Sequence, residues 1–402
     1  MSTSILYHGF GIKGYKYLST HYEGGAMRFR ITKNIMRCAS CGSRNVIRRG
    51  QIPRIFRSVP IGRKAVWISL LVQRLQCLTC GLVRQAKLGF ADPRRSYTKA
   101  FERYALELCR SMTILDVARH LGVSWDVVKD IQKRNLTRRF SKPKLRKLKK
   151  IAIDEISIGK GHDYLTVVLD LETGAVVFVA EGKGAEGLKP FWKKIACARA
   201  RIEAVATDMS PAYIGAVTEN VKEAVIVLDH FHVIKLFNNK LSEFRRNLHA
   251  AATTALEKRV LKGTRWLLLK APDNLDETRN EQQRLQQALD LNMPLATVYY
   301  MKEDLRQLWN QKNKAAAAVF LDDWIARANA SNVTMLVKFA RTLSSHRSGI
   351  LAYYDYPIST GPLEGTNNKI KTMKRQAYGF RDKEFFKLKI MALHQAKYAL
   401  VG

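Results

Sequence analysis

The order of apolar segments between residues 151 and 228 restricts the fold of this chain more than any other feature of its sequence. Three segments with strand-like patterning come first, and Glu172-Thr-Gly174 provides a hairpin turn between the second and the third. Two helical segments then alternate with two further strands. The predicted strands are Ile151–Ile158, Tyr164–Leu171, Ala175–Ala180, Ile202–Thr207 and Ala224–Leu228, and the predicted helices are about Ala185–Ala198 and Pro211–Asn220.

This β-β-β-α-β-α-β order predicts a mixed sheet, in which an antiparallel meander is joined to parallel strands by crossover helices. It is the order of a ribonuclease-H-like α/β core. The pattern is then helical and rich in Leu, Gln, Lys and Ala up to about residue 352, and residues 361–399 are helical and basic. We therefore expect a core at residues 151–402 that carries a helical insertion at about 233–352.

Two aspartates occupy special positions on this predicted sheet. Asp154 lies within an apolar strand, where a charge is costly unless it is paired or bound to a metal, and Asp208 directly follows a strand. Glu155 competes with Asp154, but successive strand side chains point to opposite faces, and we choose Asp154. An ordinary ion pair with a lysine is the alternative for either aspartate.

Carboxylates at neighbouring strands are suitable ligands for hard divalent cations such as Mg²⁺. Two such ions about 3.5–4 Å apart serve phosphodiester cleavage and transfer, and a helix that crosses this edge would supply a third acid. Glu364 opens the final helical segment and is a candidate, although an acid in a first helical turn often only complements the helix dipole. The pattern alone leaves other acids open for this role.

Two cysteine pairs mark the first part of the chain. Each pair has the form C-x-x-C-G, and strand-like residues Val66–Val72 lie between the pairs. Two such knuckles place four thiolates around one structural Zn²⁺, which predicts a zinc ribbon at residues 1–92. Redox activity is the alternative, but one pair would suffice for it. The predicted ligands are Cys38, Cys41, Cys77 and Cys80, and the other two cysteines, Cys109 and Cys197, are expected in the core.

Residues 93–140 have the spacing of a DNA-binding helix-turn-helix. Ala118 is small where two helices must approach, Gly122 suits the turn, and Ser124 can cap the second helix. A plain helical hairpin is the alternative. The core face of the second helix would hold Val123, Val128 and Ile131. Its other face would offer Trp125, Asp126, Lys129, Asp130, Gln132 and Lys133 to DNA.

A basic stretch follows, with ten Lys and Arg and no acid between Lys133 and Lys150. We expect residues 141–150 to be a linker, and Arg138 and Arg139 to contact phosphates; a solvated charged helix is the alternative. The whole chain carries a formal net charge of +35, which favours a polyanionic partner, above all double-stranded DNA. An anionic membrane surface is the other candidate, but no apolar run reaches the roughly 20 residues of a membrane span. We expect a cytoplasmic, nucleoid-associated protein.

Several motifs together resemble transposases of the ISL-three insertion-sequence family of bacteria. They are the cysteine knuckles, the helix-turn-helix and four further stretches, although Ala39 stands where the first knuckle usually has Pro. The stretches are Ala152-Ile-Asp-Glu, Ala206-Thr-Asp-Met-Ser, Val227-Leu-Asp-His-Phe-His-Val, and Gly361-Pro-Leu-Glu-Gly-Thr-Asn-Asn-Lys-Ile-Lys with Arg375-Gln-Ala-Tyr-Gly-Phe-Arg.

The resemblance implies a DDE recombinase that binds terminal inverted repeats and target DNA, and works as a homo-oligomer in a synaptic complex. It selects Glu364 as the third ligand, beside Asp154 and Asp208, for two Mg²⁺ or Mn²⁺ ions. A non-catalytic DNA-binding regulator derived from a transposase, or a nuclease such as a junction resolvase, remains open.

Two further groups of residues complete the predicted site. The first, Asp229 and His232 with Asn368, is expected to support the metal ligands, although a hydrogen-bond network at the strand end is the alternative for Asp229 and His232. The second is a basic row along the final helix that is expected to bind phosphates. That row consists of Lys371, Lys374 and Arg375.

Overall fold

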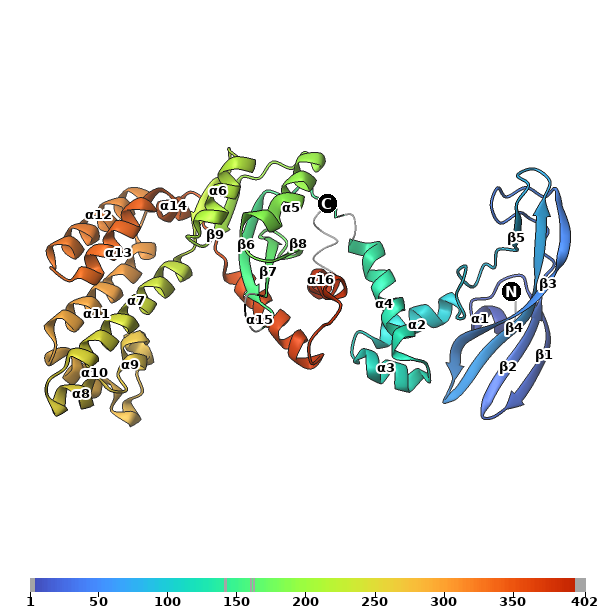
Figure 1. The fold of residues 1–402 in the computed structure, drawn as a ribbon, viewed down its shortest axis with the longest axis horizontal. Helices are drawn as coiled ribbons and strands as arrows, with labels where there is room; N and C mark the ends of the chain where they lie inside the picture. The colour runs from blue at the N-terminus through green and yellow to red at the C-terminus, as the bar shows by residue number, and fades with distance from the viewer. Residues whose placement is uncertain (1–3, 141–142, 160, 162, 395–402) are drawn as a thin grey trace. The chain divides into compact units, whose positions relative to one another are not determined.

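A computed structural model describes residues 4–140, 143–159, 161 and 163–394 of the chain. The chain separates into two compact units, Met1–Arg139 and Phe140–Gly402 (Figure 1). Parts of two predicted segments, residues 141–142 of the linker and residues 395–399 of the last helical stretch, lie outside the described residues.

The first unit opens with a short helix, α1 (Ile5–His8), and a five-stranded sheet of order β1-β2-β4-β3, in which β5 pairs with the last residues of β4. The strands are β1 (Lys16–Glu23), β2 (Ala26–Thr32), β3 (Val46–Ile61), β4 (Lys64–Cys77) and β5 (Val83–Gln85). The strand predicted at Val66–Val72 lies within β4, where Val66, Ile68, Leu70 and Val72 alternate into the core with Phe29 and Phe56.

The helix-turn-helix follows in the same unit as α2 (Lys99–Leu108), α3 (Ile114–Leu121) and α4 (Trp125–Phe140). Gly122 ends α3 in the left-handed conformation, with φ of 61°, as the turn requires. Ser124 Oγ accepts the amide proton of Val127, so it caps α4 as predicted. Val128 and Ile131 are fully buried, whereas Val123 is only partly buried.

Residues 133–140 continue helix α4, in which Leu136 and Phe140 are apolar and buried. The two cysteines that were expected in the core are less buried than predicted. Cys109 is only partly buried at the end of α2. In the second unit, Cys197 is exposed, since it points away from the buried face formed by Leu188, Phe191 and Ile195.

The second unit contains a five-stranded sheet of order β10-β9-β6-β7-β8. Strands β6, β7 and β8 are antiparallel neighbours, whereas β9 runs parallel to both β6 and β10. The strands are β6 (Lys150–Ser157), β7 (Tyr164–Asp170), β8 (Val176–Glu181), β9 (Ala204–Thr207) and β10 (Val225–Leu228). All five strands were predicted, but β9 is two residues shorter at its start than the apolar pattern.

Helices cover both faces of this sheet (Figure 1). On one face, α5 (Ala185–Ala198) and α6 (Pro211–Asn220) pack on Ile151, Ile153 and other residues of one strand parity. On the other face, α15 (Gly361–Gln376) and α16 (Lys383–Met391) pack on Ala152, Ile156 and their neighbours. Asp154 therefore lies on the sheet face that α15 covers, and Glu155 lies on the face that α6 covers.

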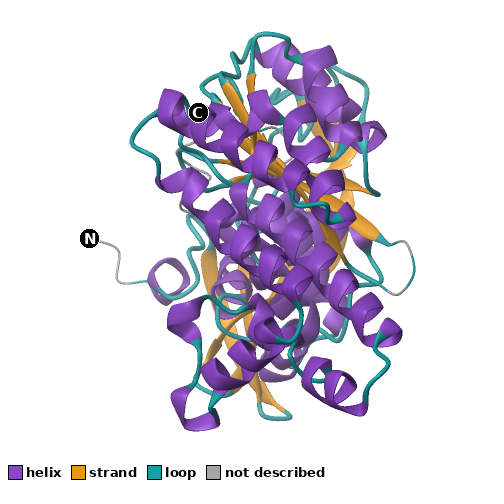
Figure 2. Ribbon diagram, turned by 90° about the vertical axis from the view of Figure 1, so that its left-hand side faces the viewer, coloured by secondary structure: helices purple, strands orange, loops and turns teal. Residues whose placement is uncertain are grey.

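A helical bundle separates β10 from α15 in the sequence, and Figure 2 looks onto its helices. Its core includes Phe237, Trp324 and Phe339, whose rings meet edge to face. The elements are α7 (His230–Ala251), α8 (Ala255–Leu261), α9 (Arg265–Leu269), η1 (Pro272–Asn274), η2 (Glu277–Arg279), α10 (Glu281–Asp290), α11 (Met293–Arg306), η3 (Gln307–Asn310), α12 (Lys314–Ala330), α13 (Thr334–Ser345), α14 (Arg347–Leu351) and η4 (Ala352–Tyr354); η5 (Ala392–His394) follows α16. Among the described residues, none of the helices could cross a bilayer.

Candidate active site and metal centre

Asp154 is the best-connected of the predicted carboxylates. It lies in the central strand β6, and its Oδ2 accepts a hydrogen bond of 2.9 Å from Nδ2 of Asn367, which is on α15. Asn367 is buried on the face of α15 that packs on the sheet. A side chain more than 200 positions along the chain is thus held directly against the strand carboxylate.

The charge on Asp154 is disfavoured by its surroundings. Burial raises the pKa of Asp154 above its ordinary value, and the nearby carboxylate of Asp208, which follows β9, raises it further. The amide of Glu155, together with the charges of His232 and Lys235 on α7, lowers it only partly. Asp154 and Asp208 are therefore close enough to repel each other. Two carboxylates that share metal ions would repel each other in the same way when no ion is bound.

Glu155 faces the opposite side of the sheet. Its Oε1 accepts a hydrogen bond of 2.6 Å from the hydroxyl of Tyr213 on α6, and this hydroxyl also contacts Thr166 at 3.1 Å. Burial and the bond to Glu155 raise the pKa of Tyr213, so the phenol stays protonated and donates. Glu155 therefore has a structural partner on the α6 face, and Asp154 alone of this pair faces α15.

Asp229 joins the two ends of the helical insertion. It directly precedes α7, and its Oδ2 accepts a hydrogen bond of 2.5 Å from the hydroxyl of Thr360, directly before α15. Its Oδ1 lies 3.4 Å from Nδ1 of His230. Burial opposes the charge of Asp229, but the bonds from His230 and Thr360 outweigh it and lower the pKa of Asp229. This is the hydrogen-bond network at the strand end that was the alternative interpretation of Asp229. Because Thr360 directly precedes α15, the network also fixes where that helix begins.

Glu364 lies in the first turn of α15, and its side chain is exposed. Its backbone amide donates to the carbonyl of Thr360 at 2.9 Å. Within the described residues, the three carboxylates of Asp154, Asp208 and Glu364 are not gathered tightly enough to form a ready metal cage. Asp154 and Asp208 thus lie near each other. Glu364 lies on α15, the helix whose Asn367 contacts Asp154. The role of Glu364 as a metal ligand stays a prediction.

Sequence reasoning missed one residue of this site and chose the wrong one of two adjacent asparagines. Lys235 is one helical turn beyond His232, and only the position of α7 shows that its charge reaches Asp154. The predicted supporting amide was Asn368, which is exposed, whereas its neighbour Asn367 makes the contact with Asp154. The burial periodicity of α15, with Leu363, Thr366 and Ile370 inside, was the signal that distinguishes the two asparagines.

The four predicted cysteine ligands lie together in the first unit. Their sulfur atoms are all within 4.8 Å of one another, and in the described part of the chain they form the one His, Cys, Asp and Glu group that could hold a metal ion. Gly42 and Gly81 follow the knuckles with φ of 76° and 71°, which only glycine adopts freely. The amide of Cys80 lowers the pKa of Cys77 to about 6, which favours the thiolate that zinc binds. The pKa of the partner thiol Cys41 is raised to about 11, because the amide of Ser43 is outweighed by the bond to Cys77 and by burial, so the four crowded sulfurs do not all ionise without a cation. The set is therefore suited to zinc.

The exposed face of α4 differs in part from the prediction. Trp125 is 43% exposed, and the ammonium of Lys129 lies 5.1 Å from the centre of its ring. Asp130, which was expected to face DNA, instead pairs with Arg95 at 2.8 Å. Gln132 was expected to face DNA as well, but it is buried. Their positions were missed because the contact between α4 and residues 92–102 is not visible in local periodicity.

Only two of the three residues in the predicted basic row on α15 are exposed. Lys371 and Arg375 are exposed, whereas the ammonium of Lys374 donates to the carbonyl of Ile158 after β6. Lys374 therefore fastens α15 to the end of β6. Binding of the row to phosphates stays a prediction.

Comparisons with known proteins agree with the resemblance seen in the motifs. A family model described as "Transposase" matches residues 151–390, and one described as "Helix-turn-helix domain of transposase family ISL3" matches residues 86–134. The chain is 32% identical over 390 residues to the transposase for insertion sequence element IS1001 of Bordetella parapertussis, covering 96% of this chain and 95% of that protein. It is 29% identical over 374 residues to the transposase for insertion sequence element IS1557 of Mycobacterium tuberculosis, strain CDC 1551 / Oshkosh, covering 86% and 83%. With both of its modules and nearly its whole length matched, the chain belongs to the ISL3 family of insertion-sequence transposases, with a helix-turn-helix for binding DNA.

Proposed function

We propose that this transposase cuts and joins DNA by a DDE mechanism in which Asp154, Asp208 and Glu364 are the catalytic carboxylates. One observation carries the proposal: the partly buried carboxylate of Asp154 lies near Asp208 and is held by Asn367 of the helix that carries Glu364. Glu155 is excluded from this role by its bond to Tyr213 on the opposite face.

The residues present fit divalent cations. Asp154 carries an ionisation that burial and Asp208 both oppose, and a cation would remove that cost. Two buried oxygens in this region, Thr207 Oγ1 and Asn367 Oδ1, have no hydrogen-bond partner among the described residues. The three carboxylates would hold two Mg²⁺ or Mn²⁺ ions, which activate the attacking oxygen and stabilise the leaving oxygen of a phosphodiester when bound.

The chemistry has two steps. In the first, water attacks the phosphorus at the transposon end, and the P–O3′ bond breaks to leave a 3′-hydroxyl and a 5′-phosphate. In the second, that 3′ oxygen bonds to a phosphorus of target DNA, and the target's own 3′ oxygen leaves with a proton. The basic residues Lys371 and Arg375 on the exposed face of α15 would hold the phosphates in line.

The sheet supports a ribonuclease-H-like assignment for the core. Its order β8-β7-β6-β9-β10, with three antiparallel strands and then two parallel ones, places Asp154 centrally and Asp208 on the neighbouring strand. We divide the chain into a zinc ribbon at 1–92, a helix-turn-helix at 93–140, a basic linker at 141–150 and a catalytic domain at 151–402, with the insertion at about 233–352.

The first two domains are proposed to bind the terminal inverted repeats. One structural Zn²⁺ on the four cysteines would hold the ribbon, and α4 would meet DNA through Trp125, Lys129 and Lys133, with Arg138 and Arg139 on the backbone. A homo-oligomer of the chain would form the synaptic complex, in the cytoplasm at the nucleoid.

The test is metal-dependent cleavage of a duplex that carries one end of the element. Wild-type protein is expected to bind the duplex without Mg²⁺ and to cut it when Mg²⁺ is added. Asp208→Asn should bind equally and cut at least about 1,000-fold more slowly, since the carboxylates contribute several kcal/mol to the transition state. Full cleavage by Asp208→Asn would refute the assignment, and a wild-type protein that binds but never cuts would favour a regulator.

A further inference from the structure

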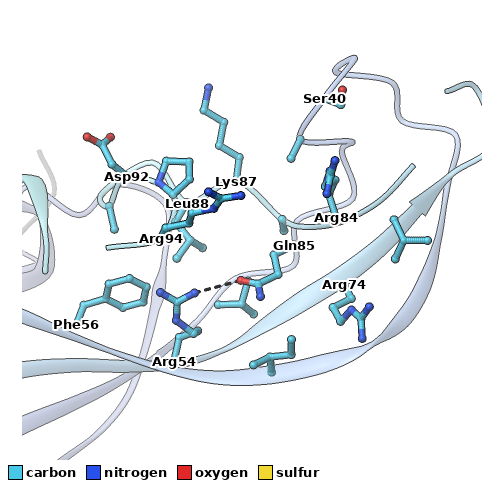
Figure 3. Close-up of a pocket in the computed structure, with 17 residues that line it drawn as sticks. Ser40, Arg54, Phe56, Arg74, Arg84, Gln85, Lys87, Leu88, Asp92 and Arg94 are labelled. Atoms are coloured by element: carbon cyan, nitrogen blue, oxygen red, sulfur yellow. Dashed lines mark hydrogen bonds between the residues drawn. The ribbon is translucent and has the colours of Figure 1, made fainter. Parts of the chain in front are cut away.

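A groove runs along the first unit beside the cysteine centre (Figure 3). Its floor is formed by β3 and β4, and its walls by β5, the segment 86–94 and the first cysteine knuckle. The groove has a volume of about 790 Å³. None of its lining residues belongs to helix α4.

The lining of the groove is strongly cationic. Its single acid, Asp92, is already paired outside the lining, with Lys99 at 3.5 Å and with Arg134 at 3.9 Å. Asp92 therefore does not neutralise the groove. The cations are Arg54, Arg74, Arg84, Lys87 and Arg94.

One of these cations has a structural role. Arg54 donates to Gln85 of β5 at 3.2 Å (Figure 3). It also donates to the carbonyl of Arg95 at 2.9 Å, so it ties the floor of the groove to β5 and to the residue that follows the segment 86–94. For the other four, no ion pair to a carboxylate is found among the residues that the structure describes. Such a set of unneutralised charges on one surface repels itself unless an anion is bound.

The backbone at Arg94 offers a way to remove one of these charges. Arg94 has φ of 60°, a left-handed conformation that a long side chain adopts only at a cost. The next residue holds the turn, because Arg95 pairs with Asp130 at 2.8 Å and its amide donates to the carbonyl of Asp92 at 3.3 Å. Glycine suits this conformation better, so Arg94→Gly removes a cation without straining the turn.

We propose that this groove binds the phosphate backbone of duplex DNA, through Arg74, Arg84, Lys87 and Arg94, as a second contact besides the helix-turn-helix. The inference rests on the proposed function, since it takes DNA as the substrate. An open groove with charges spread along it matches a row of phosphates better than a small anion. Phosphate contacts fix position and do not read sequence, so the groove contributes affinity to every duplex alike.

The cysteine centre forms part of this site. Ala39 and Ser40, which lie between Cys38 and Cys41, line one end of the groove. The amide of Ser40 donates to the sulfur of Cys38 at 3.3 Å, so the wall keeps its shape only while the knuckle does. Loss of zinc should therefore destabilise the ribbon and also weaken the binding of this groove to the DNA backbone.

The test measures how the affinity of the full chain for a mixed-sequence DNA duplex depends on salt. The variant replaces Arg74, Arg84, Lys87 and Arg94 by Gln. Removing one cation that neutralises a phosphate should reduce the slope of log affinity against log salt by about 0.9, so removing all four should reduce it by about 3.6. Between about 50 and about 200 mM salt, the wild-type protein should then lose roughly 100-fold more affinity than the variant.

A control variant with the same change of net charge replaces exposed cations elsewhere in the unit. Its slope should equal the wild-type slope, because these cations lie outside the groove. Circular dichroism and zinc content confirm that both variants fold. If the fourfold variant fails to fold, Arg94→Gly serves instead, because glycine suits the turn and removes one cation from the groove. The control positions are Lys16, Arg28, Arg63 and Lys64, each to Gln.

The outcomes separate this inference from the proposed function. An unchanged slope in the groove variant overturns the inference, even if the wild-type protein cuts end-containing DNA normally. A lost preference for the end duplex, with the slope kept, also overturns it, because the groove would then read bases. A reduced slope together with an unchanged preference supports it, whether or not cleavage by the three carboxylates is observed.

Discussion

The neighbouring acids Asp154 and Glu155 allow a matched test of the active-site assignment. Asp154→Asn should abolish cleavage yet raise the stability of the protein in buffer without Mg²⁺. The reason is that burial and Asp208 raise the pKa of Asp154 in the folded state, so its charge costs stability. Such a group contributes stability below its unfolded pKa of about 3.9, and that stability is lost as pH rises through the higher folded pKa.

Glu155→Gln should have the opposite pattern. The bond of 2.6 Å from Tyr213 to the Glu155 carboxylate is charge-assisted, and glutamine can accept it only as a neutral group. The difference between charged and neutral hydrogen bonds is about 1 kcal/mol, which lowers the melting temperature of a domain of this size by about 2–4 °C. Cleavage should persist, because Glu155 faces α6 and not α15.

Thermal unfolding with and without Mg²⁺, in protein that retains its zinc, distinguishes these patterns. Mg²⁺ should stabilise the wild type and Glu155→Gln, because it binds only the folded carboxylates, and should have little effect on Asp154→Asn. The advantage of Asp154→Asn in Mg²⁺-free buffer should vanish near pH 3, where the carboxyl is protonated in both states. The reasoning fails if Glu155→Gln loses cleavage while Asp154→Asn retains it, or if Asp154→Asn is the less stable protein at neutral pH.

Four other expectations follow from single contacts. Zinc release, followed with a colorimetric chelator, should accelerate as pH falls, because protons compete with zinc for the four thiolates. Thr360→Val should lower the unfolding free energy by about 1–3 kcal/mol, measured in urea, because it leaves an oxygen of buried Asp229 without its donor; Thr360→Ser, which keeps the hydroxyl, should cost less. Tyr378→Gly should raise the melting temperature slightly, since Tyr378 has φ of 52° and a fully exposed side chain; a lower melting temperature would contradict this. Trp125→Ala should weaken binding of end-containing DNA in a mobility-shift assay, while its circular dichroism stays unchanged because the ring is exposed.

Local patterns were sufficient for most of the second unit. Strand and helix periodicity located all five strands and both crossover helices, since each element has one buried face that the sequence displays. The same holds for the cysteine centre, because spacing alone brings two thiolates of each knuckle to one point. The first two strands of the chain were missed, because most residues of β1 are exposed and its apolar positions do not alternate cleanly.

Contacts between segments that are distant in the sequence could not be predicted from local patterns. Asp130 was assigned to DNA, yet it serves Arg95, 35 positions earlier, in a contact that no local pattern records. Asn367 and Asn368 look equivalent in the sequence until the helix is placed on the sheet and one of them turns inward. Lys235 enters the site only because α7 starts where β10 ends, close to the end of β9.

The third carboxylate is the sharpest example, and the structure explains why the insertion does not displace it. The segment between Asp229 and Thr360 leaves the sheet and returns, and one hydrogen bond of 2.5 Å between these two residues closes it. Three hydrogen bonds then place α15: Thr360 on Asp229 at its start, Asn367 on Asp154 at its middle and Lys374 on the carbonyl of Ile158 near its end. None of the three depends on the length or content of the bundle between them. The position of Glu364 relative to the sheet is therefore set by residues that flank the insertion, so an insertion of another size could be accommodated without moving the site.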